Sequence, residues 1–252
     1  MVSWSTKRQF IYVSIVLSVF IIFLALPTFF IVYKAPSCTD GKQNQNELGT
    51  DCGGPCSVLC RASALDLIVH WQRAFKVKDG IYNVLAYVEN PNLDSGVNSI
   101  SYIFKLYDKD NVLIYERRGQ TFVPPKKIFG IFESNIITGT RVPATVFFEF
   151  SQPPVWTKEY RKDGPIAITG QVLSGQDSMP RLSAILENRS FEPMYNTEVV
   201  AVIYGPDGNA VGASRTIVDS VEKGASTNLT FTWPEPFSGL ATRIELLSRS
   251  LR

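Results

Sequence analysis

A stretch of 24 residues without a charged side chain, FIYVSIVLSVFIIFLALPTFFIVY from Phe10 to Tyr33, constrains this chain most. About 20 apolar residues in a helix are enough to cross a membrane, so the stretch predicts a transmembrane helix over residues 10–33. Pro27 is tolerated in such a helix, although it would break a helix in water. The alternative is a cleaved signal peptide, but its apolar core would span only ~7–15 residues and the cleavage motif is a poor match here.

The charges on either side of the apolar stretch predict its orientation. Lys7 and Arg8 precede it, whereas acidic residues follow it between positions 40 and 51. Positively charged flanks stay in the cytoplasm. We therefore expect residues 1–9 to be cytoplasmic and everything after the helix to lie outside the cell membrane, held by this single span.

The charge balance and the composition exclude several functions. The formal net charge is +2, which Lys7 and Arg8 alone account for, so the rest of the chain is neutral. Without a basic field the chain is not expected to bind nucleic acid. A content of 45% hydrophobic and 12% aromatic residues indicates a folded chain. The single histidine, His70, limits the catalytic designs available, and we predict no enzyme.

All the cysteines fall within 23 residues just after the apolar stretch. They are Cys38, Cys52, Cys56 and Cys60. An even number outside the cytoplasm predicts two disulfides, and the sequence leaves all three pairings open. A zinc site is the alternative, but the usual C-x2-C arms are absent. The spacing thus predicts a disulfide-stapled module over residues 34–62.

The same module is rich in side chains that bind hard cations. These are Asp40, Asn44, Asn46, Glu47 and Asp51. Calcium takes six to eight oxygen ligands from carboxylates, amides and carbonyls, so this set predicts a calcium site, although its order does not match an EF-hand. The alternative is a solvated spacer whose oxygens bond water and the backbone of turns.

The module resembles the pattern C-x-DG-x-x-N-x-x-E-x-x-x-DCGG-x-C-x-x-C of many secreted and surface proteins. The matching residues are Cys38, Asp40, Gly41, Asn44, Glu47, Asp51, Cys52, Gly53, Gly54 and Cys56. Cys60 comes one residue late. The resemblance covers a small part of the chain, and it implies calcium for the acidic and amide residues and disulfides for the cysteines.

From Leu65 onward, short runs rich in β-branched and aromatic residues alternate with turn signals, as in a sandwich of strands. The runs are 65–69, 82–88, 99–107, 112–115, 128–132, 145–150, 166–172, 181–186, 198–204, 210–213, 228–232 and 243–247. The two halves are alike, because VENPNLDSGVNSISYIFKLYDKDNVLI (88–114) parallels LENRSFEPMYNTEVVAVIYGPDGNAVG (186–212). We therefore predict a mainly β chain with two tandem immunoglobulin-like sandwiches, 65–157 and 163–252, and a boundary near Lys158–Asp163.

Residues 104–108 read FKLYD, and this half resembles the FxLYD domain of bacterial and archaeal surface proteins. The motif residues are Phe104, Leu106, Tyr107 and Asp108. The second half departs from the motif, with Ala201, Ile203, Tyr204 and Gly205 in these places. The resemblance implies an immunoglobulin-like or fibronectin-III-like sandwich outside the membrane, and no known ligand.

Together these features predict a non-catalytic, membrane-anchored protein of a bacterial envelope. Its two sandwiches would bind or scaffold a protein or glycan partner. A structural subunit of a larger membrane complex is the first alternative and an enzyme the second.

Two stretches have the form of an N-glycosylation sequon, and they begin at Asn188 and Asn228. We expect His70 to be a surface or half-buried residue.

Overall fold

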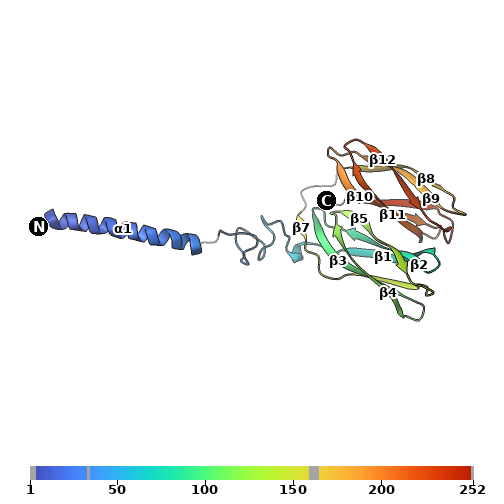
Figure 1. Cartoon of the computed structure of the whole chain (residues 1–252), viewed down its shortest axis with the longest axis horizontal. Coiled ribbons are helices and arrows are strands. Elements are labelled where there is room, and N and C mark those ends of the chain that lie inside the picture. Colours follow the sequence, from blue (N-terminus) through green and yellow to red (C-terminus); the bar gives the residue numbers. More distant parts are fainter. Residues whose placement is uncertain (1–3, 33–34, 159–164, 251–252) are drawn as a thin grey trace. The chain divides into compact units, whose positions relative to one another are not determined.

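The computed structural model describes residues 4–32, 35–158 and 165–250, with the helix side chains up to Thr28. The chain divides into two compact units, residues 1–56 and 57–252 (Figure 1). The first contains the helix and most of the cysteine module, and the second contains the strands. The expected sandwich boundary near Lys158–Asp163 falls almost wholly outside the described residues.

Helix α1 (Trp4–Val32) begins with a polar segment that includes Lys7 and Arg8, and from Phe10 to Thr28 it is apolar on every side. No part of its spanning window is buried. The window Trp4–Thr28 has a mean hydropathy of 2.7, which confirms that the helix is long and apolar enough to cross a membrane. The Ser18 and Thr28 hydroxyls donate to the carbonyls of Ser14 and Leu24, so neither is left unpaired on the apolar surface.

The second unit is built of strands. In the first half they are β1 (Ile68–Lys78), β2 (Ile81–Asn90), β3 (Ser95–Tyr107), β4 (Leu113–Val123), β5 (Lys127–Ile137), β6 (Thr145–Phe150) and β7 (Thr157–Lys158). In the second half they are β8 (Ile166–Ser174), β9 (Arg181–Asn188), β10 (Met194–Tyr204), β11 (Ala210–Val221), β12 (Ser226–Thr232) and β13 (Arg243–Ser250). Each predicted run overlaps a strand. The first predicted run, 65–69, starts before β1 and ends well before it. Strand β1 begins at Ile68 and continues through polar residues to Lys78.

The two halves have the same topology. The first has sheets β1-β2-β5 and β4-β3-β6, with β7 added beside β3. The second has sheets β8-β9-β12 and β11-β10-β13, so that β8 to β13 repeat β1 to β6 in order. All strand pairs are antiparallel. The mainly β fold predicted from the sequence is thus confirmed, and we call residues 65–158 and 165–250 the first and second repeat.

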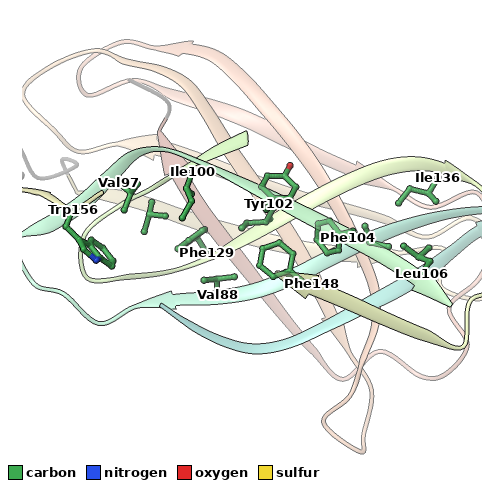
Figure 2. Close-up of a cluster of buried hydrophobic side chains, with 14 residues drawn as sticks. Val88, Val97, Ile100, Tyr102, Phe104, Leu106, Phe129, Ile136, Phe148 and Trp156 are labelled. Carbon is green, nitrogen blue, oxygen red and sulfur yellow. The ribbon is translucent and has the colours of Figure 1, made fainter. Parts of the chain in front are cut away.

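Each repeat closes over a hydrophobic core of its own. In the first repeat Phe104, Tyr102 and Phe148 pack ring against ring, with centroids 4.8–5.8 Å apart (Figure 2). In the second repeat the positions of β10 that match Tyr102 and Phe104 hold the smaller Val199 and Ala201, which lie in its core. Alternation along β3 and β10 places every second side chain in these cores.

A buried asparagine ends the second strand of each repeat. Asn90 Nδ2 donates to the carbonyls of Ser95 and Pro124, both at 2.8 Å. Asn188 Nδ2 donates in the same way to Glu192 (2.8 Å) and Val221 (3.0 Å). The Glu-Asn pair that recurs in the sequence is therefore a clamp between two loops. Because Asn188 is fully buried, its sequon is not accessible in the folded chain.

Asn188→Ala should lower the free energy of unfolding by about 2–4 kcal/mol, since it strands buried carbonyls and removes the clamp. Asn228→Ala, at the exposed sequon, is the matched control and should change it by less than about 0.5 kcal/mol. Urea unfolding of a chain that begins at residue 35 measures both. This chain keeps all four cysteines, and both cores draw only on residues after the helix. Equal effects of the two variants would contradict the clamp.

Candidate functional site

The cysteine module is oxidised. Cys38 and Cys56 form a disulfide with Cα atoms 5.6 Å apart. None of the four cysteines, all of which lie among the described residues, is free. Since structural zinc needs thiolate ligands, this arrangement favours the disulfide prediction over a zinc site.

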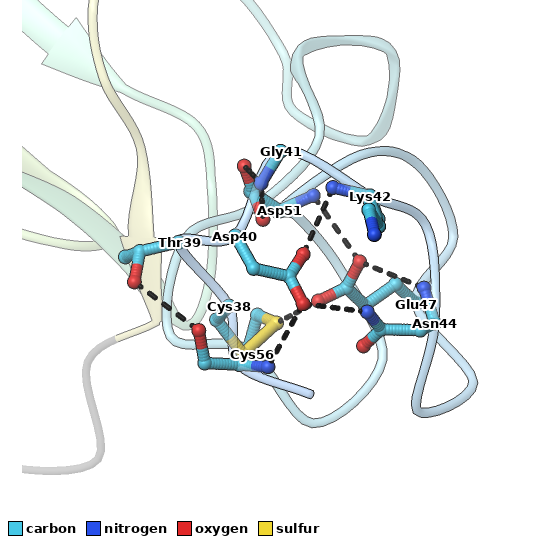
Figure 3. Close-up of a disulfide and its surroundings, with 10 residues drawn as sticks. Cys38, Thr39, Asp40, Gly41, Lys42, Asn44, Glu47, Asp51 and Cys56 are labelled. Atoms are coloured by element: carbon cyan, nitrogen blue, oxygen red, sulfur yellow. Dashed lines mark hydrogen bonds between the residues drawn. A yellow bond between two sulfur atoms is a disulfide. The ribbon is translucent and has the colours of Figure 1, made fainter. Parts of the chain in front are cut away.

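The carboxylates of the module cap backbone turns (Figure 3). Asp40 accepts from the backbone N–H of Lys42 at 2.9 Å and from the amide of Asn44 at 2.8 Å. The bond from Asn44 is the main reason why the pKa of Asp40 lies below its usual value. Asp51 accepts from the N–H of Gly41 at 2.9 Å and so closes the loop between them. The contacts with Lys42 and Gly41 replace water on backbone donors.

Glu47 is the most buried acid of the module, 6% exposed. Its Oε2 accepts from the backbone N–H groups of Asn44 (3.3 Å) and Asp51 (3.2 Å), and its Oε1 lies 3.1 Å from Cys56 Sγ. Asn46 takes a left-handed backbone conformation with φ 65°. Glu47 thereby holds together the turns on which the other predicted ligands lie.

The predicted calcium ligands do not form one compact acidic group. Over the described part of the chain, one trio of His, Cys, Asp or Glu ligand atoms lies within 4.8 Å: Cys38, Glu47 and Cys56. Two of these are disulfide sulfurs. The amide oxygen of Asn44 is the one buried oxygen of the predicted set without a hydrogen-bond partner. The geometry thus favours turn-capping oxygens, and calcium binding stays a prediction.

The FxLYD-like motif has a structural role in the first repeat. Phe104 and Leu106 are fully buried. Asp108 accepts from the N–H of Val112 (2.9 Å) and of Asp110 (3.0 Å) in the hairpin turn after β3, and it pairs with Arg141. The bond from Val112 is the main cause that lowers the pKa of Asp108. The motif therefore fixes a core and a turn rather than a reactive site.

His70 lies on β1, where its Nε2 is 2.8 Å from Glu89 Oε2 on β2. Its ring meets Tyr87 edge to face at 5.8 Å. The histidine side chain is 39% exposed. A cross-strand polar contact at a sheet surface accounts for this residue, as expected for a half-buried histidine.

The sequence did not reveal the feature that most distinguishes the second unit, a third hydrophobic core between the repeats. Sheet β1-β2-β5 of the first repeat and sheet β11-β10-β13 of the second pack against each other there. Its buried members are Phe75, Leu85, Phe132, Val200, Val202, Tyr204, Ala210, Ala213 and Leu247. We call this set the inter-repeat core. The contact is not symmetric, since each repeat contributes a different sheet.

Strand β10 is buried on both faces, and β3, its counterpart, is not. The inward side chains of β10 belong to the core of the second repeat, while Val200, Val202 and Tyr204 enter the inter-repeat core. At the corresponding place on β3, Lys105 forms an ion pair with Glu149 at 2.8 Å and is partly exposed. This face is therefore polar and uncovered in the first repeat. In the second repeat the same face is apolar and packs against the first repeat.

Gly130 on β5 makes the close approach of the sheets feasible. A Cβ atom at this position would lie 2.8 Å from Leu85 Cδ1 and 3.3 Å from Val200 Cγ1. Those separations are too short for packed carbon atoms, so a larger residue would force the side chains of Leu85 and Val200 to shift.

Two tyrosines, one from each repeat, share one carboxylate beside the inter-repeat core. Tyr87 and Tyr204 donate to Glu245 Oε1 and Oε2, both at 2.8 Å. Trp71 stacks on Tyr87 at 5.1 Å, and the Arg243 guanidinium lies 3.7 Å from the Tyr204 ring centre. Burial, reinforced by the Glu245 carboxylate, raises the pKa of both tyrosines above the ordinary value.

An ion pair is buried where the second repeat meets β4 of the first. Arg249 Nη2 donates to Glu198 Oε2 at 3.0 Å, and the two residues are 5% and 4% exposed. Arg249 Nη1 reaches into the first repeat, to Thr121 Oγ1 (2.8 Å) and the Phe122 carbonyl (3.1 Å). Burial lowers the pKa of Arg249, and Glu198 acts against this shift. At the matching strand positions the first repeat has Ser101 and Ser151, so the pair belongs to the junction rather than to the fold.

One signal in the sequence could have revealed the junction. The run VVAVIY from Val199 to Tyr204 has no polar residue, whereas a strand with one solvent face alternates. Arg249 and Glu198, 51 positions apart, gave no such signal.

Comparisons with known proteins do not show a family for this chain. No family model matches the chain, and no curated protein matches it. Among solved structures, a transglutaminase of red sea bream is similar at a TM-score of 0.27 and 11% identity, over 74% of this chain and 29% of that one. The resemblances to the FxLYD family and to the cysteine pattern rest on the sequence motifs alone.

Calcium and turn capping make different predictions for Asp51. If its carboxylate caps the loop, Asp51→Ala should lower the melting temperature of residues 35–252 equally in chelator and in millimolar calcium, because Gly41 loses its acceptor in both. Bound calcium would instead raise the midpoint of the parent chain, and the substitution would abolish that rise. Thermal melts of both chains in both buffers decide between them.

Arg249→Ala should destabilise residues 35–252 by about 3–5 kcal/mol, because Glu198 stays buried without its partner. The double variant Glu198→Leu/Arg249→Met should lose much less, since it removes both charges. Arg118→Ala, which breaks an exposed pair with Glu116, is the control and should cost under about 1 kcal/mol. Urea unfolding measures all three. A loss for Arg249→Ala no larger than for the control would contradict the buried pair.

The raised pKa values of Tyr87 and Tyr204 predict a loss of stability in alkali. Their folded-state pKa lies above the unfolded value of about 10, so their contribution is complete below pH ~10 and declines as the pH rises beyond it. Replacement of both by Phe should flatten this alkaline decline, whereas Tyr195→Phe, at an exposed tyrosine, should not. Stability measured against pH from 8 to 11 tests this, and identical profiles for the two variants would refute it.

Proposed function

We propose that this protein is a non-catalytic, membrane-anchored envelope protein that holds two β-sandwich repeats outside the membrane as one rigid binding unit. The observation that carries the proposal is the inter-repeat core, with Val200 and Val202 fully buried against the first repeat. A buried apolar contact fixes the angle between two domains, whereas sandwiches joined by a linker alone would turn independently.

The helix and the cysteines support the location. An N-terminal helix with the length and hydropathy for one membrane crossing would act as the anchor. Lys7 and Arg8 before it favour a cytoplasmic N-terminus. Oxidised cysteines directly after it suit an oxidising space on the far side.

The polar groups of the strands support a binding rather than a catalytic role. His70 contacts Glu89, and Asp108 caps a turn. Both polar side chains are thus engaged in contacts that stabilise the fold. A catalytic constellation would bring a nucleophile, a base and an oxyanion site together.

Protease treatment of intact cells that produce the full-length protein tests the location. A tag after residue 252 should be removed from intact cells, and a tag before residue 1 should be lost only after lysis. The reverse pattern, or protection of both tags, would contradict the proposal.

Crosslinking on the same intact cells, with the tagged protein as bait, then separates display from assembly. Glycan or several weakly captured envelope proteins would support a display unit. One partner captured in equal amount would support the alternative, a structural subunit of a larger membrane complex.

A further inference from the structure

The sheet β8-β9-β12 of the second repeat exposes a face that its counterpart in the first repeat buries. Strands β2 and β9 both end in the Glu-Asn pair, which aligns the two sheets. Two positions before this pair, Tyr87 of β2 lies opposite Gly130 of β5. At the same place in the second repeat, Ile185 of β9 lies opposite Asn228 of β12. Asn228 therefore takes the place of Gly130, the glycine at which the first repeat meets the second.

The side chains around this place differ in kind between the repeats. In the first repeat Leu85 and Phe132 lie beside Gly130 and belong to the inter-repeat core. In the second repeat Ser183 and Thr230 hold the same two positions, and both are exposed. Polar side chains on a sheet face are typical of a face that stays in contact with solvent. This face of the second repeat is therefore not shaped to receive another sheet.

Asn228 and Thr230 project together from this open face. They are two residues apart on β12, so their side chains leave the same side of the sheet, and both are exposed. Leu229 between them is fully buried. The stretch has the form N-x-T, the acceptor motif of N-glycosylation. Asn188, which begins the other motif of this form, is fully buried and cannot carry a glycan in the folded chain.

We propose that Asn228 is an N-glycosylation site whose glycan covers the open face of the second repeat. The donor is a lipid-linked oligosaccharide, a polyprenyl phosphate or diphosphate sugar, and a transferase of the cell catalyses the step. Asn228 Nδ2 forms a bond to the anomeric carbon of the sugar, and the bond from that carbon to the phosphate oxygen breaks. The amide nitrogen gives up one proton, which balances the negative charge gained by the leaving phosphate. The inference rests on the proposed function, because lipid-linked donors are used on the side of the membrane where that function places the repeats.

The glycan would have a physical role at this place. Ile185 lies directly opposite Asn228 and is 42% exposed. Side chains opposite each other on paired strands are about 5 Å apart, so the first sugar would cover this apolar side chain. A bulky, hydrated group here would also keep a further sheet from packing on the second repeat, as the charges of Lys105 and Glu149 do on the uncovered face of the first.

Tandem mass spectrometry of the full-length protein, isolated from the cells that naturally produce it, tests the proposal. The tryptic peptide of residues 224–243, GASTNLTFTWPEPFSGLATR, should carry a glycan on Asn228, and Asn188 should be unmodified. Thr230→Ser keeps the motif and should keep the glycan. Thr230→Val should abolish the modification, because it removes the hydroxyl while leaving Asn228 in place. Valine is β-branched like threonine and suits an exposed strand position, so this variant should still fold.

Three results would overturn the glycosylation site. These are an unmodified peptide from the parent chain, equal modification of Thr230→Val and Thr230→Ser, and a glycan on Asn188 in place of Asn228. If the protease experiment still places the repeats outside, the proposed function stands without the glycan. If the peptide is unmodified and the protease experiment also places the repeats inside, the proposed function is wrong and the site with it.

Discussion

The structure of the strand-rich unit depends on an apolar layer that the two repeats bury between them. Val200, Val202 and Leu85 lie in this layer with almost no exposed surface. Burial of apolar area is the main favourable term in such a contact, and Gly130 lets the sheets come close enough for it. The polar groups at its border, Glu245 with its two tyrosines and the Glu198–Arg249 pair, add direction to a contact that is otherwise non-directional.

This layer explains why two repeats of one topology have different surfaces. Strand β10 must be apolar on both faces, since each face is covered by a different sheet. Its counterpart β3 keeps Lys105, which forms an ion pair with Glu149 of β6 on the uncovered face. A charged face prevents a further copy from stacking in the same way, as terminal repeats do in longer arrays. The same asymmetry confines the buried ion pair to one place in the molecule.

Much of the fold could be read from the sequence, because its signals are local. The apolar helix needs only length and the absence of charge, and the strands need only short apolar runs between turns. The repeated Glu-Asn pair marked the clamps at Asn90 and Asn188, although its role was visible only in the structure. At the junction, the sequence marked the apolar run from Val199 to Tyr204 but not the strands that cover it. The junction joins Arg249 to Thr121 and Tyr87 to Glu245, and no local pattern encodes which distant strands meet. In the cysteine module, the sequence showed that the oxygen-bearing side chains are close together along the chain. It did not show in which direction each carboxylate points.

The central claim is that the repeats form one rigid body, and residual dipolar couplings of residues 35–252 test it most directly. Backbone couplings from the two repeats should fit a single alignment tensor in the orientation that the inter-repeat core fixes. Two tensors of different magnitude would show that the sandwiches turn independently, and the account of the junction would then be wrong.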